Sequence, residues 1–199
     1  MEDLTILICS HGDERWRDLA FSRAYPSATG QANTYVFHLP DATLAEVRNF
    51  AAEQVETEWL CFLDADDELD FGYVDAMSRY VDGGEALLAP AVKYIDPRRK
   101  TAPACLPNEP GDMRAINRCV IGTLIRRHTF FEAGGFQEWP CYEDWDLFLT
   151  VHLRGVPIVY VPDAVYKAHV SRVSRNAPGH RRVAAHTYHQ IRVKHGLAV

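Results

Sequence analysis

The residues best suited to chemistry are five acids that directly follow an apolar segment. The segment runs from Trp59 to Leu63, which is the length and character of a strand buried on both faces. The acids are Asp64, Asp66, Asp67, Glu68 and Asp70. Alternate residues of an extended chain point the same way, so Asp64 and Asp66 could share one ligand, and a divalent cation would relieve the repulsion among the carboxylates. Alternatively, Asp66 or Asp67 caps a helix that begins near Asp70, and the other acids are solvated.

A second group combines acids with aromatic residues. Glu143 and Asp144 stand among Trp139, Tyr142 and Trp145. Aromatic faces pack on the apolar face of a sugar ring, carboxylates bind its hydroxyls, and a carboxylate in such a place can act as a general base. The simpler interpretation is that the acids complement the dipole of a helix start and that the aromatic residues belong to the core.

The first third of the chain alternates between strand and helix patterns. Strands are predicted at 4–9, 34–37 and 59–63, with helices at 14–23 and 40–54 between them. This order implies a parallel sheet with right-handed crossovers. Ligands of such sheets bind just beyond the carboxyl ends of the strands, where Asp64 and Asp66 stand.

The remaining elements extend the same α/β domain. A loop is predicted at 26–30 and a long surface loop, with room for a hairpin, at 93–111. The other predicted elements are helices at 71–80, 127–132, 143–154 and 178–194, and strands at 86–91, 119–125, 157–161 and 164–168. One domain accommodates them all.

Composition favours a water-soluble protein in a reducing compartment. The chain has 199 residues, of which 47% are hydrophobic and 24% charged, and no apolar run approaches the roughly 18 residues that a membrane-spanning helix needs. Its five cysteines are odd in number and form no Cys-x-x-Cys pair, which favours reduced thiols in the cytoplasm. Cys9 and Cys61 lie in apolar runs and are predicted in the core. The acidic N-terminus does not predict a signal peptide.

Charge is unevenly distributed along the chain. All 27 acids lie at or before Asp163, whereas the 36 residues from Ala164 onward contain seven Lys or Arg and no acid. Such a basic tail indicates an anionic partner, which could be a diphosphate, a nucleic acid, a lipid surface or the acidic body of the same protein. The helix predicted at 178–194 could pack on the body or form a homodimer contact.

Motifs spread along the chain resemble those of family 2 nucleotide-sugar glycosyltransferases. Residues 62–67 resemble the family's Asp-x-Asp motif, and 47–49 its Ala-Arg-Asn. Residues 134–136 and 142–147 resemble its Gly-Gly-Phe and Glu-Asp motifs, and 166–169 its late histidine segment. The resemblance implies a single Rossmann-like domain of the A-type glycosyltransferase fold, with a mixed, mainly parallel sheet flanked by helices. Residues 1–176 would form the catalytic domain, and 177–199 its basic C-terminal helix or tail.

The resemblance also implies a metal-dependent reaction that inverts the sugar carbon. Asp66 would be the main ligand of Mn²⁺ or Mg²⁺, Asp64 would contact the metal or the ribose, and His169 would complete the coordination. Asp144 would be the general base that takes the proton of the acceptor hydroxyl, and Glu143 would hold a hydroxyl or orient that base. Asp67, Glu68 and Asp70 are expected to be ordinary loop and helix-start acids.

Other side chains would bind the donor and the acceptor. The implied donor is a nucleoside-diphosphate-sugar, with a UDP-sugar favoured. Arg48 is assigned to the donor nucleotide, and Arg172 and Arg175 could clamp the diphosphate. Trp139, Tyr142 and Trp145 are assigned to the sugar substrates. The acceptor could be a glycan, a lipid-linked molecule or, through the basic tail, a modified nucleic acid.

Two positions depart from the family pattern. The first strand ends in Ser10-His11 where the family usually has Asn, and the second ends in 38–41, His-Leu-Pro-Asp, where the family has Asp-Asp-Gly-Ser. Asp41 is the candidate to replace the acid that reads the nucleobase. This departure leaves a catalytically silent nucleotide- or sugar-binding module as an alternative. A nucleotidyltransferase is a further one, opposed by the absence of a Gly-rich phosphate loop with a following Lys.

Overall fold

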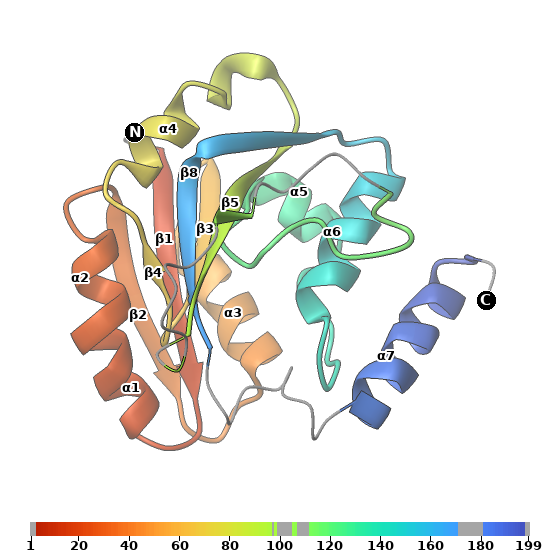
Figure 1. The fold of residues 1–199 in the computed structure, drawn as a ribbon, viewed down its shortest axis with the longest axis horizontal. Helices are drawn as coiled ribbons and strands as arrows, with labels where there is room; N and C mark the ends of the chain where they lie inside the picture. The colour runs from red at the N-terminus through yellow and green to blue at the C-terminus, as the bar shows by residue number, and fades with distance from the viewer. Residues whose placement is uncertain (1–2, 97, 99–104, 107–111, 171–180, 198–199) are drawn as a thin grey trace.

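The computed structural model describes residues 3–96, 98, 105–106, 112–170 and 181–197, which form one sheet flanked by helices (Figure 1). The strand order is β2-β1-β3-β7-β5-β8-β4, and β6 pairs with β5. The strands are β1 (Leu4–His11), β2 (Asn33–Leu39), β3 (Trp59–Asp64), β4 (Glu68–Leu69), β5 (Leu87–Ile95), β6 (Cys105–Leu106), β7 (Leu124–Arg126) and β8 (Ile158–His169).

Helices connect and cover these strands. They are α1 (Arg15–Leu19), the π-helical turn η1 (Ala20–Ala24), α2 (Tyr25–Ala28), α3 (Leu44–Glu53), α4 (Tyr73–Ser78), the 3-10 turn η2 (Val81–Gly83), α5 (Arg127–Glu132), α6 (Glu143–Leu153) and α7 (Arg181–Lys194). No helix in this described part of the chain combines the length and apolar character that a membrane crossing requires.

The first three strands form the predicted parallel unit. β1 lies between β2 and β3 and runs parallel to both. Every residue of β1 before His11 is buried, as are the first five residues of β3, because helices cover both faces of this part of the sheet. The register places Ser10 beside His38, and Cys9 beside Asp64. The carboxyl ends of these strands therefore meet at one edge.

The second half of the sheet is mixed. β7 is antiparallel to β3 and β5, β8 is parallel to β5, and β4 is antiparallel to β8. The predicted strand at 119–125 begins only at Leu124. The two predicted strands at 157–161 and 164–168 are one strand, β8. An irregularity between Pro90 and Ala91 lets β8 bulge around Pro162, a residue that has no N–H to donate to the ladder.

The helical segment after β1 is longer than predicted. Helical structure continues to Ala28, so the predicted loop at 26–30 is wrong for its first three residues. Pro26 cannot donate to the carbonyl of Ser22, and the segment takes a π-helical turn just before it. The helix predicted at 40–54, for which Asp41 and Thr43 are both possible caps, is α3; it begins at Leu44 with Thr43 as its cap, in a capping box with Glu46.

The buried cysteines and the hairpin agree with the predictions made from the sequence. The side chains of Cys9, Cys61, Cys119 and Cys141 are buried, and burial raises the pKa of the first three to about 12. β6 pairs antiparallel with β5 through Val92 and Leu106, which gives the hairpin expected within 93–111. Most of that segment lies outside the described residues.

Candidate active site

Arg48 joins the two acidic groups that lie far apart in the sequence. It projects from α3, is 1% exposed, and donates from Nη2 to Asp64 Oδ1 at 2.6 Å and from Nη1 to Glu143 Oε1 at 2.8 Å. Its guanidinium also lies over the ring of Phe136, 4.9 Å from the centroid. Burial opposes the charged form, but Asp64 and Glu143 outweigh it and raise the pKa of Arg48. One buried cation therefore ties the end of β3 to the start of α6.

The next residue, Asn49, fixes the Gly-Gly-Phe segment. Its amide donates to the Phe136 carbonyl and accepts from the Phe136 N–H, both at 2.9 Å. Gly135 has a φ of 64°, and a Cβ there would lie 2.6 Å from Asn49 Oδ1. Only glycine suits that backbone and that space. The Arg-Asn and Gly-Gly-Phe motifs therefore form one contact.

Three carboxylates converge at the end of β3. Asp64, Asp66 and Asp67 each offer an oxygen within 4.8 Å of the others. Burial and the charge of Asp64 raise the pKa of Asp66, with the Arg23 guanidinium acting in the opposite direction. Like charges at this spacing are what a divalent cation with oxygen ligands would neutralise.

Asp67 is more than the loop acid that was expected. Its side chain accepts 2.7 Å hydrogen bonds from the Tyr166 hydroxyl and from the His169 N–H. Burial, and then the charges of Asp64 and Asp66, raise its pKa well above the usual range. The prediction for Asp67 is therefore wrong: it ties the acid loop to the end of β8.

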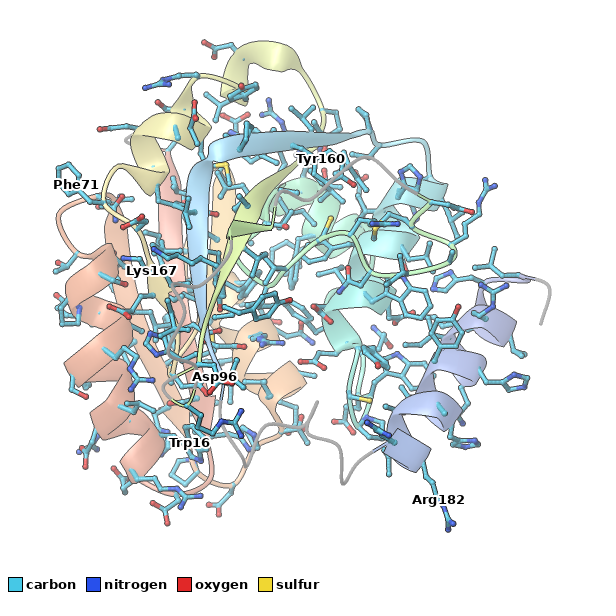
Figure 2. All side chains as sticks on the ribbon, viewed as in Figure 1. Trp16, Phe71, Asp96, Tyr160, Lys167 and Arg182 are labelled. Atoms are coloured by element: carbon cyan, nitrogen blue, oxygen red, sulfur yellow. The ribbon has the colours of Figure 1, made fainter. Side chains whose placement is uncertain are left out.

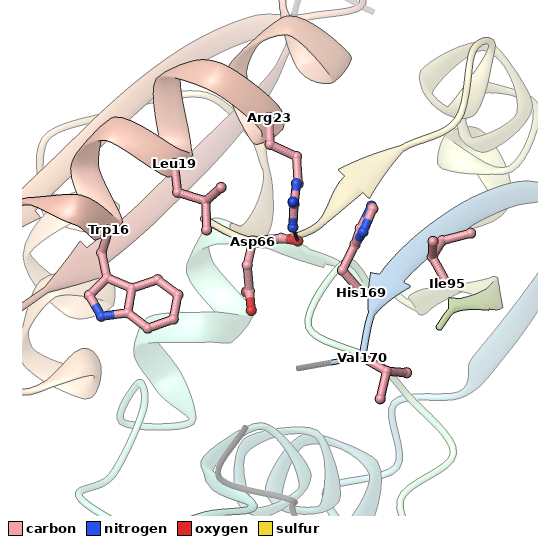
Figure 3. A pocket seen from close by; sticks show the side chains of 7 residues that line it. All are labelled: Trp16, Leu19, Arg23, Asp66, Ile95, His169 and Val170. Carbon is pink, nitrogen blue, oxygen red and sulfur yellow. Dashed lines mark hydrogen bonds between the residues drawn. The ribbon is translucent and has the colours of Figure 1, made fainter. Parts of the chain in front are cut away.

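His169 lies beside the acids with its ring turned toward Glu68. Its Nε2 is 2.5 Å from Glu68 Oε2, and Figure 3 shows the imidazole directed away from the Asp66 carboxylate. Glu68 therefore also differs from the solvated acid that was expected. Asp70 accepts from the Phe71 N–H at the start of the next turn and also pairs with Lys167 of β8, Nζ to Oδ1 at 2.8 Å, so it too is tied to β8. A role of His169 in metal coordination stays a prediction.

A pocket of about 290 Å³ opens beside Asp66. It is lined by Trp16, Leu19, Arg23, Asp66, Ile95, His169 and Val170 (Figure 3). The first three come from the helical segment after β1 and were not singled out from the sequence. Their spacing, i, i+3 and i+7 on one helical face directly after a strand end, is the signal that could have found them.

Asp144 lies in the first turn of α6, next to the Glu143 that Arg48 binds. Its Oδ2 accepts from Asn117 Nδ2 at 2.9 Å, and its Oδ1 from its neighbour's N–H at 2.8 Å. Burial, and then the charge of Glu143, raise the pKa of Asp144 to about 6. A carboxylate that titrates near neutral pH is suited to accept a proton from a hydroxyl. Asn117 was not predicted from the sequence.

The aromatic residues around Asp144 divide into two kinds. Trp145 is 1% exposed, donates from Nε1 to the Met113 carbonyl at 2.8 Å, and stacks on Tyr188 of α7 at 5.0 Å. Its ring is thus part of the core and offers no open face to a sugar, which corrects its assignment to substrate binding. The side chains of Trp139 and Tyr142 are half-buried, so part of each ring remains exposed.

The positions that depart from the family pattern lie together. Ser10 Oγ is 2.9 Å from His38 Nδ1 where β1 and β2 end, and the His38 side chain is 5% exposed. Asp41 is exposed in the turn that follows β2. A serine–histidine pair therefore occupies the strand ends. Arg172 and Arg175 lie outside the described residues.

Part of the basic tail is bound to the protein's own body. Lys194 donates to both carboxylate oxygens of Asp146 at 2.6 and 2.8 Å, and Arg192 donates to the Arg114 carbonyl at 2.6 Å. Asp146 is 1% exposed and also accepts from Trp139. In contrast, Arg181 and Arg182 are exposed, and Arg182 points away from the body (Figure 2).

Comparison with known proteins assigns the family. A model of the family described as "Glycosyl transferase family 2" matches residues 23–134, more than half of the chain. The chain therefore belongs to this family. None of the curated proteins compared with the chain matches it.

Solved structures share the fold of this chain. S. aureus TarS 1–349 in complex with UDP-GlcNAc is 14% identical, with a TM-score of 0.61 over 92% of this chain and 64% of that chain. Its complex with UDP is 15% identical, with a TM-score of 0.59 over 86% of this chain and 61% of that chain. The likeness confirms the predicted A-type fold. The chain spans less than two thirds of these structures.

Proposed function

We propose that the protein is a metal-dependent inverting glycosyltransferase that moves a sugar from a UDP-sugar to an acceptor hydroxyl. The observation that carries this proposal is the pair of hydrogen bonds by which Arg48 joins Asp64 to Glu143, the neighbour of Asp144. They bring the acids suited to bind a metal and the acid suited to act as a base into one site. Family membership supports the reaction class. The complexes of TarS with UDP and UDP-GlcNAc support the donor.

Asp66 and Asp64 would hold Mn²⁺ or Mg²⁺, with Asp67 beside them. The three carboxylates fit such an ion because it prefers oxygen ligands and their oxygens already lie within 4.8 Å of one another. When bound, the ion would stabilise the negative charge of the leaving diphosphate. His169 remains a candidate ligand, and Arg172 and Arg175 remain candidates for the diphosphate.

Asp144 would act as the general base. In one displacement, the acceptor oxygen bonds to the sugar carbon, its proton passes to the Asp144 carboxylate, and the bond from that carbon to the diphosphate oxygen breaks. Attack opposite the leaving group inverts the carbon. Asn117 orients the carboxylate through its 2.9 Å hydrogen bond, and a pKa of about 6 leaves it ionised at neutral pH.

Glu143 and Arg48 would position other groups of the site and would not take part in the reaction themselves. Glu143 is buried, and its carboxylate binds Arg48, so it orients the start of α6. Arg48 likewise donates to Asp64 instead of facing the solvent, so it would act on the donor nucleotide indirectly, by positioning Asp64. Asp41 remains a candidate for the nucleobase beside the Ser10–His38 pair.

The acceptor would bind near Asp144, Trp139 and Tyr142. A glycan or a lipid-linked sugar fits half-buried aromatic rings beside a carboxylate. A nucleic-acid acceptor is supported only by exposed basic residues of α7 such as Arg181 and Arg182. If a nucleic acid were the acceptor, its affinity would fall steeply as salt is added. We keep a cytoplasmic location, a catalytic domain at 1–176 with 177–199 as its tail, and a homodimer as further proposals.

A thermal-stability screen of nucleotide sugars with Mn²⁺ tests the proposal. A UDP-sugar should raise the unfolding temperature in the presence of Mn²⁺ and much less after chelation. Release of UDP from the same donor should then follow. Stabilisation without any turnover on donors and acceptors would instead favour the silent binding module. No stabilisation by any nucleotide sugar would contradict both.

A further inference from the structure

The helical segment after β1 and the turn that follows it contact the loop that carries the acids after β3. Arg23, Ser27 and Gln31 are spaced by four residues, and each makes a hydrogen bond to the main chain of residues 66–74. We call these three residues the helical clasp. No predicted site residue belongs to it, and its partners are main-chain atoms rather than the carboxylates themselves.

The first two contacts hold the loop before and within β4. Arg23 Nη1 donates to the Asp66 carbonyl at 2.8 Å, and Ser27 Oγ accepts from the Leu69 N–H at 3.0 Å. β4 is only two residues long and stands at the edge of the sheet, paired with β8 alone. Ser27 thus satisfies an edge N–H that has no strand partner on that side.

The third contact holds the loop beyond β4. Gln31 donates from Nε2 to the Asp70 carbonyl and accepts at Oε1 from the Val74 N–H, both at 3.2 Å. The same Nε2 lies 2.7 Å from the Ser27 carbonyl, so the Gln31 side chain is also fixed to the end of α2. The clasp therefore grips the loop from Asp66 to the first turn of α4.

This grip determines which way Asp66 points. Figure 3 shows the Asp66 carbonyl directed toward Arg23 and its carboxylate directed the opposite way, into the pocket beside Trp16. The carboxylate oxygens of Asp64, Asp66 and Asp67 lie within 4.8 Å of one another, so their charges repel when no cation lies between them. A short edge segment that carries such repulsion needs an external restraint to keep its ligand geometry without the ion.

The π-helical turn η1 sets the direction of the clasp. Arg23 lies within it and Ser27 follows it in α2. A π-helical turn rotates all later side chains relative to an unbroken α-helix, and such turns are frequent at functional sites. Pro26, which prevents the regular hydrogen bond from its position, accounts for the turn.

We propose that the helical clasp is a positioning element that preorganises the Asp64–Asp66–Asp67 cluster for a divalent cation and the diphosphate it carries. This inference rests on the proposed function, since it requires a metal at these acids. It predicts that the clasp acts on cation affinity, while the chemistry at Asp144 is unchanged once the cation is bound.

The test measures Mn²⁺ affinity by electron paramagnetic resonance in the presence of UDP. Ser27→Ala and Gln31→Ala should each weaken Mn²⁺ binding about fivefold, the effect of losing one or two hydrogen bonds, and the double variant more. Ser22→Ala and Arg17→Gln are matched controls, because Ser22 bonds only within its helix and Arg17 pairs with Glu14 at the surface. Both should bind Mn²⁺ as the wild type does.

Two further readouts separate positioning from general destabilisation. Saturating Mn²⁺ should restore kcat of the clasp variants, whereas a variant of the ligand itself, Asp66→Asn, should not recover. Clasp variants that bind Mn²⁺ as tightly as the wild type, with any loss confined to the unfolding temperature, would overturn the inference and leave the proposed function standing. A wild-type protein that binds no Mn²⁺ with UDP would overturn both.

Discussion

The two acidic groups of the site are assembled in different ways. Asp64, Asp66 and Asp67 are neighbours in the chain, and the end of one buried strand brings them together. Asp144 instead depends on distant partners: Asn117 holds its carboxylate, and Arg48 holds the adjacent Glu143. The first group is therefore a local feature, whereas the second exists only in the folded chain.

The difference indicates where each group is vulnerable. Substitutions near Asp64, Asp66 and Asp67 should act on the binding of the cation and of the donor. Changes around Asp144 should act on proton transfer, and those at its supports on stability as well. Arg48 belongs to both groups, because it donates to Asp64 and to Glu143. The predictions below separate the two groups, beginning with the largest effect.

Asp66→Asn should reduce transfer about a thousandfold or more, because it removes a charged ligand from an ion that stabilises the leaving group by several kcal/mol. Initial rates with a UDP-sugar at fixed Mn²⁺ measure this. Asp75→Asn on the exposed face of α4 is the control and should keep the wild-type rate. Equal activity of Asp66→Asn would remove this residue from the metal site.

Asp144→Asn should lower kcat by about two to four powers of ten, the usual contribution of a general base. The variant should still bind UDP and Mn²⁺, because Asp64, Asp66 and Asp67 are unchanged. Steady-state rates and a UDP titration on the same preparation make the comparison. A variant that turns over normally would require a different base.

Arg48→Met should destabilise the fold by about 3–5 kcal/mol, because Asp64 and Glu143 are left without their buried cation. Urea denaturation measures the change. Arg79→Met is the control: this arginine is 66% exposed and should change stability by less than about 0.5 kcal/mol. Adding Glu143→Gln to Arg48→Met should recover part of the loss. Wild-type stability in Arg48→Met would break the link between the two groups.

Activity should depend on the ionisation of Asp144. Its pKa is raised to about 6, so the base is lost as pH falls through about 6, and kcat/KM should drop about tenfold per pH unit below that value. Because the folded state favours the protonated form, this group stabilises the fold below its ordinary pKa, and that contribution is lost as pH rises through about 6. Asn117→Ala removes a donor to the ionised form and should move the activity limb to higher pH. A profile that is flat between pH 5 and 7 would contradict the assignment.

Lys194→Met should have the smallest effect, a loss of about 1 kcal/mol of stability, since His195 still contacts Asp146 at 2.8 Å. Thermal unfolding measures it. Affinity for Mn²⁺ should be unchanged, because α7 supports the Asp144 side only. A weaker Mn²⁺ affinity in this variant would show that the two groups are not separable in this way.

Much of the fold follows from the sequence because its signals are local. The buried strand β3, the cap Thr43 and helix α5 are set by patterns within a few residues. The merged strand β8 was not predictable in the same way, since Pro162 mimics a strand end and only pairing with β5 continues the strand.

The residues of the candidate site also differ in how far the sequence predicts them. The acids after β3 and the Glu-Asp pair are visible in the sequence, but their supports are not. Asn117, Arg23 and the partner of Glu68 are fixed by contacts between segments many residues apart. Trp145 shows the converse error: an aromatic residue beside an acid was assigned to a substrate, while packing against Tyr188 places it in the core.

Calorimetric titration of UDP, with and without Mn²⁺, tests the central claim most directly. If the acids at the end of β3 hold a cation that binds the diphosphate, UDP should bind the wild-type protein at least tenfold more tightly with Mn²⁺ than in a chelator, and Asp66→Asn should lose this difference. UDP affinity that is the same with Mn²⁺, in the chelator and in Asp66→Asn would contradict the account.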